Sequence, residues 1–467
     1  MSVRRAEAPR LQGNIGLFQY LALGFGTVIG SAWVILLGDW LGEAGPGGAV
    51  LGFLCGALVV MTVGACYAEL TARLPEAGSE FIYAHRVYGR GLAFTVGWFL
   101  VLYLISVTVF EALALAWIVE IVIPEWKSAT LYTAFGMAIS TETLVIGGSA
   151  ALLIFFLNVR SAKVAVVTHS ILTYGFFAVV LCILAALLIN GHTAHLRPLF
   201  ATTNSRPWWL GSGTIFAFTA YGLNGFQAIP QAIEERSGAI SLRTIGFVIV
   251  GSIAAAALFY CLVVIAASAV LPWRSLVSEP LPMATAASAL PHGQAFVTAL
   301  LIATAVSLFK AWNGVFMMAT RLLVAMARVG YVPGVLAQLH PRYRSPLAAL
   351  VLVSVLTLGG IFFGKGAIEP ITDMAAMVLT LTYVMCCVTV LKIRKQGASA
   401  HFQVAGGALI VWLGVIGAAS MAVVAFISPF WQQTGVPLEW RLLGGWSVIG
   451  VAVWFYRVRA LATINRP

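Results

Sequence analysis

Glu111 and Lys310 are ionisable residues that lie deep inside long apolar runs of the sequence. A charge in the hydrocarbon of a bilayer costs roughly 3 kcal/mol or much more, so such residues are functional by default. A buried carboxylate such as Glu111 can pair with the amine of a ligand, pair with Lys310, or carry a proton. Lys310 is expected either to brace a broken span as a tethered cation or to lose its proton during a working cycle. The alternative for Lys310 is a side chain that reaches out of the hydrocarbon from a misplaced span end.

Two glycine-rich stretches interrupt apolar segments, at residues 24–32 (GFGTVIGSA) and 216–227 (FAFTAYGLNGFQ). Unwound backbone at membrane depth is tolerated only where it lines a cavity. Glycine-interrupted spans at matching places in two halves of a chain indicate the binding site of a transporter. We therefore predict breaks near Ile29–Ala32 and near Gly222–Gly225. In one span alone, glycine is more often a packing surface, but the matched pair favours two breaks.

The two predicted breaks offer opposite charge to a ligand. The N–H groups of Ser31 and Ala32 begin the second half of the first segment, and a helix N-terminus of this kind attracts a carboxylate. The first half of the second segment ends with carbonyls, which attract an ammonium group. Carbonyls around Ile29 and residues 221–224 would meet this group, with Glu111 beside them. The pair of breaks therefore predicts a site for an α-amino acid zwitterion.

Membrane spans must position these residues. The chain has 467 residues, of which 61% are hydrophobic and 9% are charged, whereas soluble domains carry about 25% charged residues. A span needs about 20 apolar residues. The sequence predicts an all-α membrane protein with twelve transmembrane helices, at about residues 15–38, 47–72, 90–122, 140–158, 164–190, 209–232, 243–271, 294–328, 346–364, 369–391, 405–428 and 441–459.

The distribution of the basic residues predicts the orientation of the chain. With the N-terminus in the cytoplasm, 20 of the 27 Lys and Arg residues fall inside, and Lys310 falls within a span. The six on the outside are Lys127, Arg197, Arg206, Arg274, Lys365 and Arg441. This is the positive-inside bias, so the net charge of +11 reflects contact with membrane lipid and does not indicate a nucleic-acid partner. An even number of spans puts both termini in the cytoplasm.

The remaining composition predicts a single membrane domain. Residues 15–459 are expected to form it, with a cytoplasmic N-terminal tail at 1–14 and a C-terminal tail at 460–467. No cleavable secretory signal is expected at the N-terminus. The six cysteines all fall in predicted spans without metal-site spacing, so we expect neither a metal site nor a cofactor.

Several short motifs follow one another in a characteristic order. They are GSA at 30–32, PEAGSEFIY at 75–83, NVRSAK at 158–163, NGFQ at 224–227 with IPQAIEE at 229–235, ATR at 319–321, RVGYVP at 328–333, and HPRYRSP at 340–346. Together they resemble the APC superfamily of amino acid, polyamine and organocation transporters over about residues 16–395.

The resemblance implies a LeuT-type fold, in which two groups of five helices form an inverted repeat and helices 1 and 6 are discontinuous. The first repeat would cover about residues 15–190 and the second about residues 209–391. Helices 11 and 12, at about residues 405–459, would follow the two repeats.

The resemblance also implies roles for individual residues. Tyr221 aligns with an aromatic residue that covers the substrate, although packing is an equally frequent role for such a ring. Ala112 aligns near a substrate contact, and Val315 replaces a tryptophan of some relatives, which would leave a roomier or more apolar pocket. The candidate substrate-binding residues are Ile29, Gly30, Ser31, Ala32, Glu111, Ala112, Tyr221, Gly222, Asn224, Gly225 and Val315. The candidate coupling residues are Lys310 and Gln227.

Two departures from the family pattern concern coupling. Gln227 replaces the acidic residue of span 6, and Phe176 stands near the position where many proton-coupled members carry a lysine in span 5. Lys310 instead lies near the place where sodium-coupled relatives hold an ion between spans 1, 5 and 8. Proton coupling through the usual two groups is therefore not expected, and a relocated proton site and plain exchange remain open.

These observations predict a secondary active transporter in the cytoplasmic (inner) membrane. It would move an amino acid or a related small amine by alternating access, either coupled to protons or as an exchanger. A membrane sensor that binds amino acids without transport is the alternative. An enzyme is not expected, because no span carries the clustered His, Asp or Cys residues that such chemistry needs. The sequence leaves the substrate and the oligomeric state open.

Overall fold

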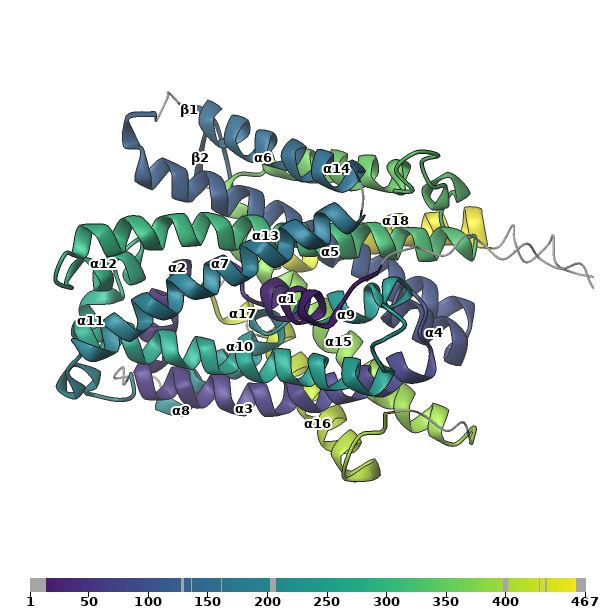
Figure 1. Cartoon of the computed structure of the whole chain (residues 1–467), viewed down its shortest axis with the longest axis horizontal. Helices are drawn as coiled ribbons and strands as arrows, with labels where there is room; N and C mark the ends of the chain where they lie inside the picture. The colour runs from purple at the N-terminus through teal and green to yellow at the C-terminus, as the bar shows by residue number, and fades with distance from the viewer. Residues whose placement is uncertain are drawn as a thin grey trace, which may run out of the picture.

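The structure of this chain is a computed structural model in which residues 14–126, 130–135, 137–160, 162–201, 207–397, 402–427, 429–432 and 435–458 are described. The predicted tails at 1–14 and 460–467 lie outside the described residues, apart from Asn14. Long helices run side by side along the longest axis of the molecule (Figure 1). The spans are α1 (Leu17–Val28) with α2 (Ala32–Ile35), α3 (Leu37–Arg73), α5 (Arg90–Val122), α6 (Thr141–Arg160), α7 (Ala162–Ile189), α8 (Trp208–Gly222) with α9 (Ala228–Gln231), α10 (Leu242–Val270), α13 (Gly293–Arg328), α14 (Leu347–Ile361), α15 (Ile368–Arg394), α16 (Gly407–Ile427) and α18 (Leu438–Val453).

The twelve predicted spans are confirmed. Nine helical segments in the described part of the chain are long and apolar enough to cross a membrane. The other three spans contain α8, α14 and α18, which have 15, 15 and 16 residues. At 1.5 Å per residue these helices are about 22–24 Å long, which is shorter than the hydrocarbon core of a bilayer. The span of α8 is completed by α9 beyond its break.

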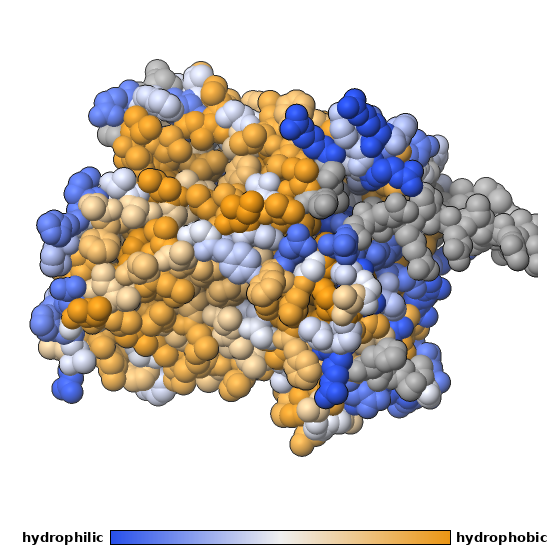
Figure 2. Space-filling view, viewed as in Figure 1, coloured by the Kyte–Doolittle hydropathy of each residue, from blue (hydrophilic) through white to orange (hydrophobic). Residues whose placement is uncertain are grey.

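An apolar belt crosses the face of the molecule that Figure 2 shows, with polar ends on both sides. Figure 2 shows hydrophobic residues as a broad band and hydrophilic residues at the two ends. One end carries α4 (Glu80–Tyr88), and we call it the α4 end. The opposite end carries β1 (Thr130–Ala134), α11 (Trp273–Leu276) and α12 (Pro282–Ser288), and we call it the hairpin end. The bilayer normal therefore follows the long axis of Figure 1.

The first span is longer than predicted. We expected it to stop near residue 38, but helix continues from Leu37 through the acidic residues Asp39 and Glu43 until Gly45. Gly45 has φ +69°, which turns the chain within one residue, and Pro46 starts the second span. Proline is compatible with a first helical turn because its fixed φ suits that position and its missing N–H would have no helical partner there. The two spans are therefore joined without a loop.

A two-stranded hairpin was not part of the all-α prediction. Strand β1 pairs antiparallel with β2 (Met137–Ser140) between α5 and α6. The side chain of Tyr132 donates a hydrogen bond to the carbonyl of Phe362 at 2.8 Å. The hairpin thus caps the ends of the helices α5, α6 and α14 outside the apolar belt.

The elements recur in the same order in the two halves of the chain. Each half has a broken span, a long span, short helices at one end, and then three further spans. The short helices are α4 at one end of the molecule and α11 and α12 at the other (Figure 1), as an inverted repeat requires. The broken spans lie in the middle, where α1 contacts α7, α10 and α13, and α8 contacts α3 and α15.

Candidate functional site

The first break lies between α1 and α2. Ile29 has extended backbone angles (φ −93°, ψ 94°), and helix resumes at Ala32. Within the described residues, the N–H groups of Gly30, Ser31 and Ala32 form no hydrogen bond. The helix is therefore broken where the sequence predicted, and the binding of a ligand by these N–H groups stays a prediction.

Side chains of α13 satisfy the carbonyls of the same break. The Nζ of Lys310 donates hydrogen bonds to Gly26 O at 2.7 Å and to Ile29 O at 2.5 Å. The Oγ of Ser307 lies 2.7 Å from Gly30 O and 3.1 Å from Ile29 O. Residues three apart share one face of a helix, so Ser307 and Lys310 reach the break together. These two side chains donate hydrogen bonds to the carbonyls of the break, which no water can reach inside the hydrocarbon of a bilayer.

The second break follows α8. Helix α8 ends at Gly222, and α9 starts at Ala228. Between them Gly225 has φ +108°, a conformation that residues with a Cβ rarely adopt. The amide oxygen of Gln227 accepts a hydrogen bond from Gly225 N at 2.7 Å, and its Nε2 donates to Tyr383 Oη at 3.3 Å. Gln227 therefore holds its own break and ties it to α15.

The second break touches the end of α1 at Gly225. A Cβ atom built on Gly225 would lie 2.7 Å from the carbonyl carbon of Thr27 and 2.8 Å from Val28 N. A Cβ on Gly314 of α13 would lie 2.3 Å from Thr27 Oγ1. These glycines allow three backbones to approach one another closely. The second break therefore packs against the last turn of α1, directly before the first break.

Three buried side-chain oxygens at this site have no partner in the described protein. They are Glu111 Oε2, Ser31 Oγ and Thr27 Oγ1, and their residues are 4%, 0% and 5% exposed. The other carboxylate oxygen of Glu111 lies 2.9 Å from the position of a Cβ on Gly30. Buried polar atoms are nearly always hydrogen-bonded, so a carboxylate oxygen and two hydroxyls without partners indicate a ligand that carries donors.

The match to known families agrees with this geometry. The family profile described as amino acid permease matches residues 15–451, which includes both breaks and the helices around them. The chain belongs to the amino acid permease family.

The permease is similar along most of its length to several named transporters. It is 27% identical to the glutamate/serine transporter AimA of Bacillus subtilis, over 96% of this chain and 82% of that protein. It is 22% identical to the methylthioribose transporter of the same species, over 99% and 97%, and 24% identical to the branched-chain amino acid permease BcaP, over 83% and 82%. These proteins are transporters, so the permease is a multi-pass membrane transporter and not an enzyme. The resemblance to the APC superfamily is confirmed.

The carbonyls expected to be free are occupied in the permease. Ile29 O accepts from Lys310, and Tyr221 O accepts from the backbone N–H of Asn224 at 3.2 Å and from the Asn224 amide. Both carbonyls are satisfied because a lysine and an asparagine reach them from within the protein. These hydrogen bonds occupy the carbonyls in this conformation, and a contact between them and a ligand's amine stays a prediction.

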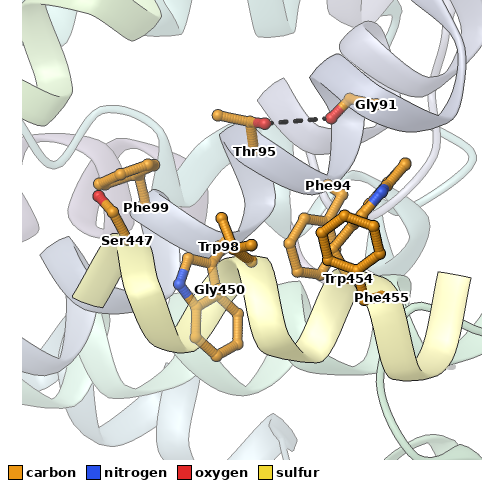
Figure 3. A pocket seen from close by; sticks show the side chains of 10 residues that line it. Gly91, Phe94, Thr95, Trp98, Phe99, Ser447, Gly450, Trp454 and Phe455 are labelled. Atoms are coloured by element: carbon orange, nitrogen blue, oxygen red, sulfur yellow. Dashed lines mark hydrogen bonds between the residues drawn. The ribbon is translucent and has the colours of Figure 1, made fainter. Parts of the chain in front are cut away.

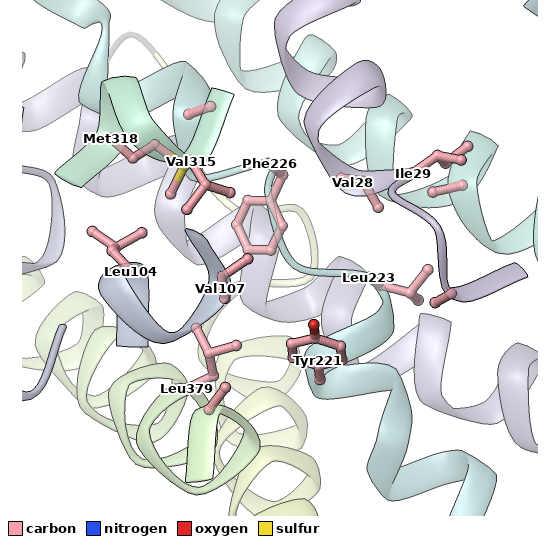
Figure 4. Packing of buried hydrophobic residues seen from close by; sticks show 14 of the residues in the cluster. Val28, Ile29, Leu104, Val107, Tyr221, Leu223, Phe226, Val315, Met318 and Leu379 are labelled. Carbon is pink, nitrogen blue, oxygen red and sulfur yellow. The ribbon is translucent and has the colours of Figure 1, made fainter. Parts of the chain in front are cut away.

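Three further candidates lie in apolar surroundings. The ring of Tyr221 is T-shaped to Phe110, with centroids 6.2 Å apart. Val315 is 2% exposed and lies beside Phe226 among buried apolar side chains (Figure 4). Ala112 is buried, and its carbonyl is 3.4 Å from the Cβ position of Gly147 on α6. Neighbouring residues of a helix point in different directions, so Glu111 and Ala112 do not share one face.

Sequence reasoning missed two residues that contact the breaks. Tyr103 Oη donates to Asn224 Oδ1 at 2.5 Å, and Ser307 contacts the first break. Ser307 lies three residues before Lys310, and Tyr103 lies eight residues before Glu111 on α5. Helical spacing from Lys310 could therefore have indicated Ser307, whereas the contact of Tyr103 depends on how α5 packs against the second break.

Two ion pairs hold the second broken span against α13 at the α4 end of the molecule. Glu235 of the segment after α9 contacts Arg321 of α13 at 2.6 Å, and Glu234 contacts Arg328 at 2.9 Å. Backbone hydrogen bonds join Ile15 to the same segment, with Ile15 N 2.9 Å from Glu235 O. The pairs link the second broken span to α13, so the two must separate if this end is to open.

Glu80 is a buried carboxyl at the same end, outside the spans. Its oxygens accept from Tyr67 Oη at 3.0 Å and from Gln231 Nε2 at 3.3 Å. The Oε1 of Gln231 accepts from Gly78 N at 3.1 Å. Burial raises the pKa of Glu80 above its ordinary value, against the effect of these donors. The carboxyl group of Glu80 in α4 therefore links α3 and α9 by hydrogen bonds. Its burial favours the neutral form of this carboxyl group.

Proposed function

We propose that the permease is a secondary active transporter that moves an amino acid or a related small amine across the cytoplasmic membrane by alternating access. The observation that carries this proposal is the contact between the two broken spans at Gly225 and Thr27, beside the unpartnered Glu111 and Ser31. A site of this kind can bind both charges of a zwitterion. Relatives named for glutamate and serine and for branched-chain amino acids support this class of substrate.

In this proposal the substrate carboxylate binds the unpaired N–H groups of Ser31 and Ala32. The positive end of a helix favours an anion there. The substrate amine binds the free oxygen of Glu111, because a charge-assisted hydrogen bond is stronger than a neutral one. The other residues proposed to line the site are Ile29, Gly30, Ala112, Tyr221, Gly222, Asn224, Gly225 and Val315.

Lys310 is proposed to act as a tethered cation that keeps the first break open to substrate. Its two hydrogen bonds to Gly26 and Ile29 supply positive charge to carbonyls that would otherwise need an ion. Release of its proton, or protonation of Glu111, would couple transport to protons. If neither occurs, the protein is an exchanger. Gln227 would serve coupling indirectly, by holding the second break.

We propose that the membrane domain covers residues 15–459, with repeats at 15–190 and 209–391 and helices 11 and 12 at 405–459. Spans 1, 2, 6 and 7 would rock against spans 3, 4, 8 and 9. The excess of Lys and Arg at the α4 end supports a cytoplasmic location for that end and for both termini.

Flux through purified permease in liposomes tests this function. A thermal-shift screen against amino acids, amines and polyamines at two pH values first identifies a ligand, because any ligand of the folded state raises apparent stability. That ligand, radiolabelled, is then offered to liposomes with and without unlabelled ligand inside, and with and without a pH gradient. Saturable uptake or exchange above that of protein-free liposomes is expected. Saturable binding without either would contradict transport and favour a sensor.

A further inference from the structure

Helix α18 is fastened to α5 by a reciprocal pair of tryptophans. Trp98 Nε1 donates to Trp446 O at 3.0 Å, and Trp446 Nε1 donates to Trp98 O at 3.0 Å. The two rings are stacked with centroids 4.5 Å apart. Both indole N–H groups are thus satisfied without water, which suits a contact inside an apolar belt.

Two grooves adjoin this contact. The first, of about 360 Å³, lies between α5 and α18 and is lined by rings such as Phe94 and Trp454 (Figure 3). The second, of about 420 Å³, lies between α5, α15 and α18. Thr95, Phe99 and Ser447 line both grooves. The grooves are therefore neighbours that one branched molecule could fill together.

The second groove is lined almost entirely by apolar side chains, among them Met377, Leu381 and Met385 of α15. Leu381 is 54% exposed although it lies within a predicted span. In a bilayer such a surface meets lipid acyl chains. The few hydroxyls in the grooves bond to their own helices, as Ser447 Oγ does to Leu443 O at 2.7 Å. In the second groove the indole N–H of Trp440 has no partner within the described residues, so a ligand here is mainly apolar with at most a single acceptor for this donor.

Basic and aromatic residues stand where the grooves approach the α4 end. Arg90 is exposed at the first residue of α5, next to the groove residue Gly91. Lys392 is exposed on α15, two turns beyond Met385, and its Nζ lies 4.2 Å from the centroid of the Tyr88 ring. Tyrosine and tryptophan gather at the membrane–water interface, and basic pockets between membrane helices bind anionic head groups. Tyr88 and Trp454 therefore indicate the depth of a lipid head group.

We propose that the grooves bind one anionic glycerophospholipid, with an acyl chain in each groove and its phosphate near Arg90 and Lys392. Two neighbouring apolar grooves suit a lipid with two chains, and two exposed cations at one end suit a negative head group. The lipid would fill the space on both sides of the Trp98–Trp446 contact and so stabilise the packing of α18. This site is separate from the broken spans and does not depend on what the permease transports.

Native mass spectrometry of the detergent-purified full-length permease tests the proposal. Phosphatidylglycerol and phosphatidylcholine with the same acyl chains are titrated against it. We expect one phosphatidylglycerol to be retained at collision energies that remove phosphatidylcholine. The variant Arg90→Gln/Lys392→Gln should bind phosphatidylglycerol about tenfold more weakly, since each basic residue near a membrane surface contributes to anionic lipid attraction. Arg243→Gln is the matched control, because Arg243 also lies over a ring, that of Phe247 at 5.9 Å, but on α10.

A second variant tests the acyl chains. Ser447→Trp places a large ring where the two grooves meet, and it should abolish retention of phosphatidylglycerol. Val448→Trp adds the same ring at a neighbouring position that is 71% exposed and should retain the lipid. The proposal is overturned if both lipids are retained equally, if the double charge variant binds like the wild type, or if Ser447→Trp keeps the lipid. A melting temperature for each variant shows that it is folded.

Discussion

The Nζ of Lys310 lies 4.6 Å from the centroid of the Phe176 ring. Lys310 belongs to α13 and Phe176 to α7, and the family resemblance implies a lysine near position 176 in many proton-coupled members. In the permease the lysine amine therefore comes from Lys310 of α13. The ring of Phe176 lies against this amine, near the position that the family resemblance gives to a lysine. A ring face attracts a cation most strongly where water is absent. One amine thus joins α1, α7 and α13.

Replacing Lys310 by methionine should impair both folding and transport. The change leaves Gly26 O without its donor and Ile29 O with Ser307 alone, and a buried acceptor left unpaired costs about 1–3 kcal/mol. We expect a lower melting temperature and a flux in liposomes reduced by about tenfold or more, with an altered dependence on pH. Ser307→Ala keeps the amine and should cost only about 1 kcal/mol. A flux and a pH profile equal to those of the wild type would reject a role for Lys310.

Replacing Glu111 by glutamine should weaken binding of the substrate amine. Glutamine keeps the shape of the side chain, but the charge-assisted hydrogen bond is lost, which is worth about 1.5–3 kcal/mol. Competition against uptake of the labelled ligand should show an apparent affinity reduced at least about tenfold. Glu125→Gln is the control, because Glu125 is exposed at the hairpin end. If Glu111→Gln leaves the affinity for every substrate unchanged, Glu111 does not bind the amine.

The variant Gly225→Ala should be strongly destabilised. Gly225 has φ +108°, and an added methyl would lie 2.7 Å from the backbone of Thr27. The strained backbone and the overpacking each cost about 1–3 kcal/mol. Gly213→Ala in α8 is a matched control, since no atom lies within 4 Å of its Cβ position. Thermal unfolding should separate the two variants by several degrees, and equal melting temperatures would contradict the close contact between the second break and α1.

Glu80 should make the permease less stable as pH rises. Burial raises its pKa in the folded state. Its contribution to the free energy of unfolding is therefore fully present below its ordinary pKa and is lost as pH rises through the raised value. Glu80→Gln stays neutral and should lose less stability than the wild type as pH rises above the ordinary pKa of a glutamate. Melting temperatures at pH values below and above that pKa measure the difference. Glu76→Gln, which removes an exposed pair with Arg86, should follow the wild-type trend, and parallel curves for Glu80→Gln and the wild type would contradict the prediction.

Much of the fold could be predicted because it depends on local composition. Apolar length and positive charge predict spans and loops, and the glycines at 30 and 225 predict where helix fails. The end of the first span could not be predicted in the same way. Asp39 and Glu43 resemble a loop, but the chain keeps its helix until Gly45, and only the positive φ at that residue decides the turn.

The site residues could be predicted where a single residue type, such as a buried acid or lysine, indicates a function. They could not be predicted where a tertiary contact determines which atoms form hydrogen bonds. Glu111 and Lys310 are conspicuous in apolar sequence, and the structure brings both to the first break. The occupied carbonyls of Ile29 and Tyr221 depend on which side chains reach them across the fold. The same holds for Tyr103, whose hydroxyl bonds to Asn224 from another helix. Such partners have no signature in a single sequence.

The one-residue turn at Gly45 couples two motions that a flexible loop would leave independent. Helix on either side of Gly45 and Pro46 runs back to Leu37, which a single residue separates from α2, and forward to Arg73 at the far membrane surface. At that surface Glu69 is clamped by Arg73 and Arg394. In the proposed transport cycle, a tilt of the helix that follows α2 is therefore expected to move the adjoining span with it and to strain the ion pairs of Glu69 on the opposite side of the bilayer.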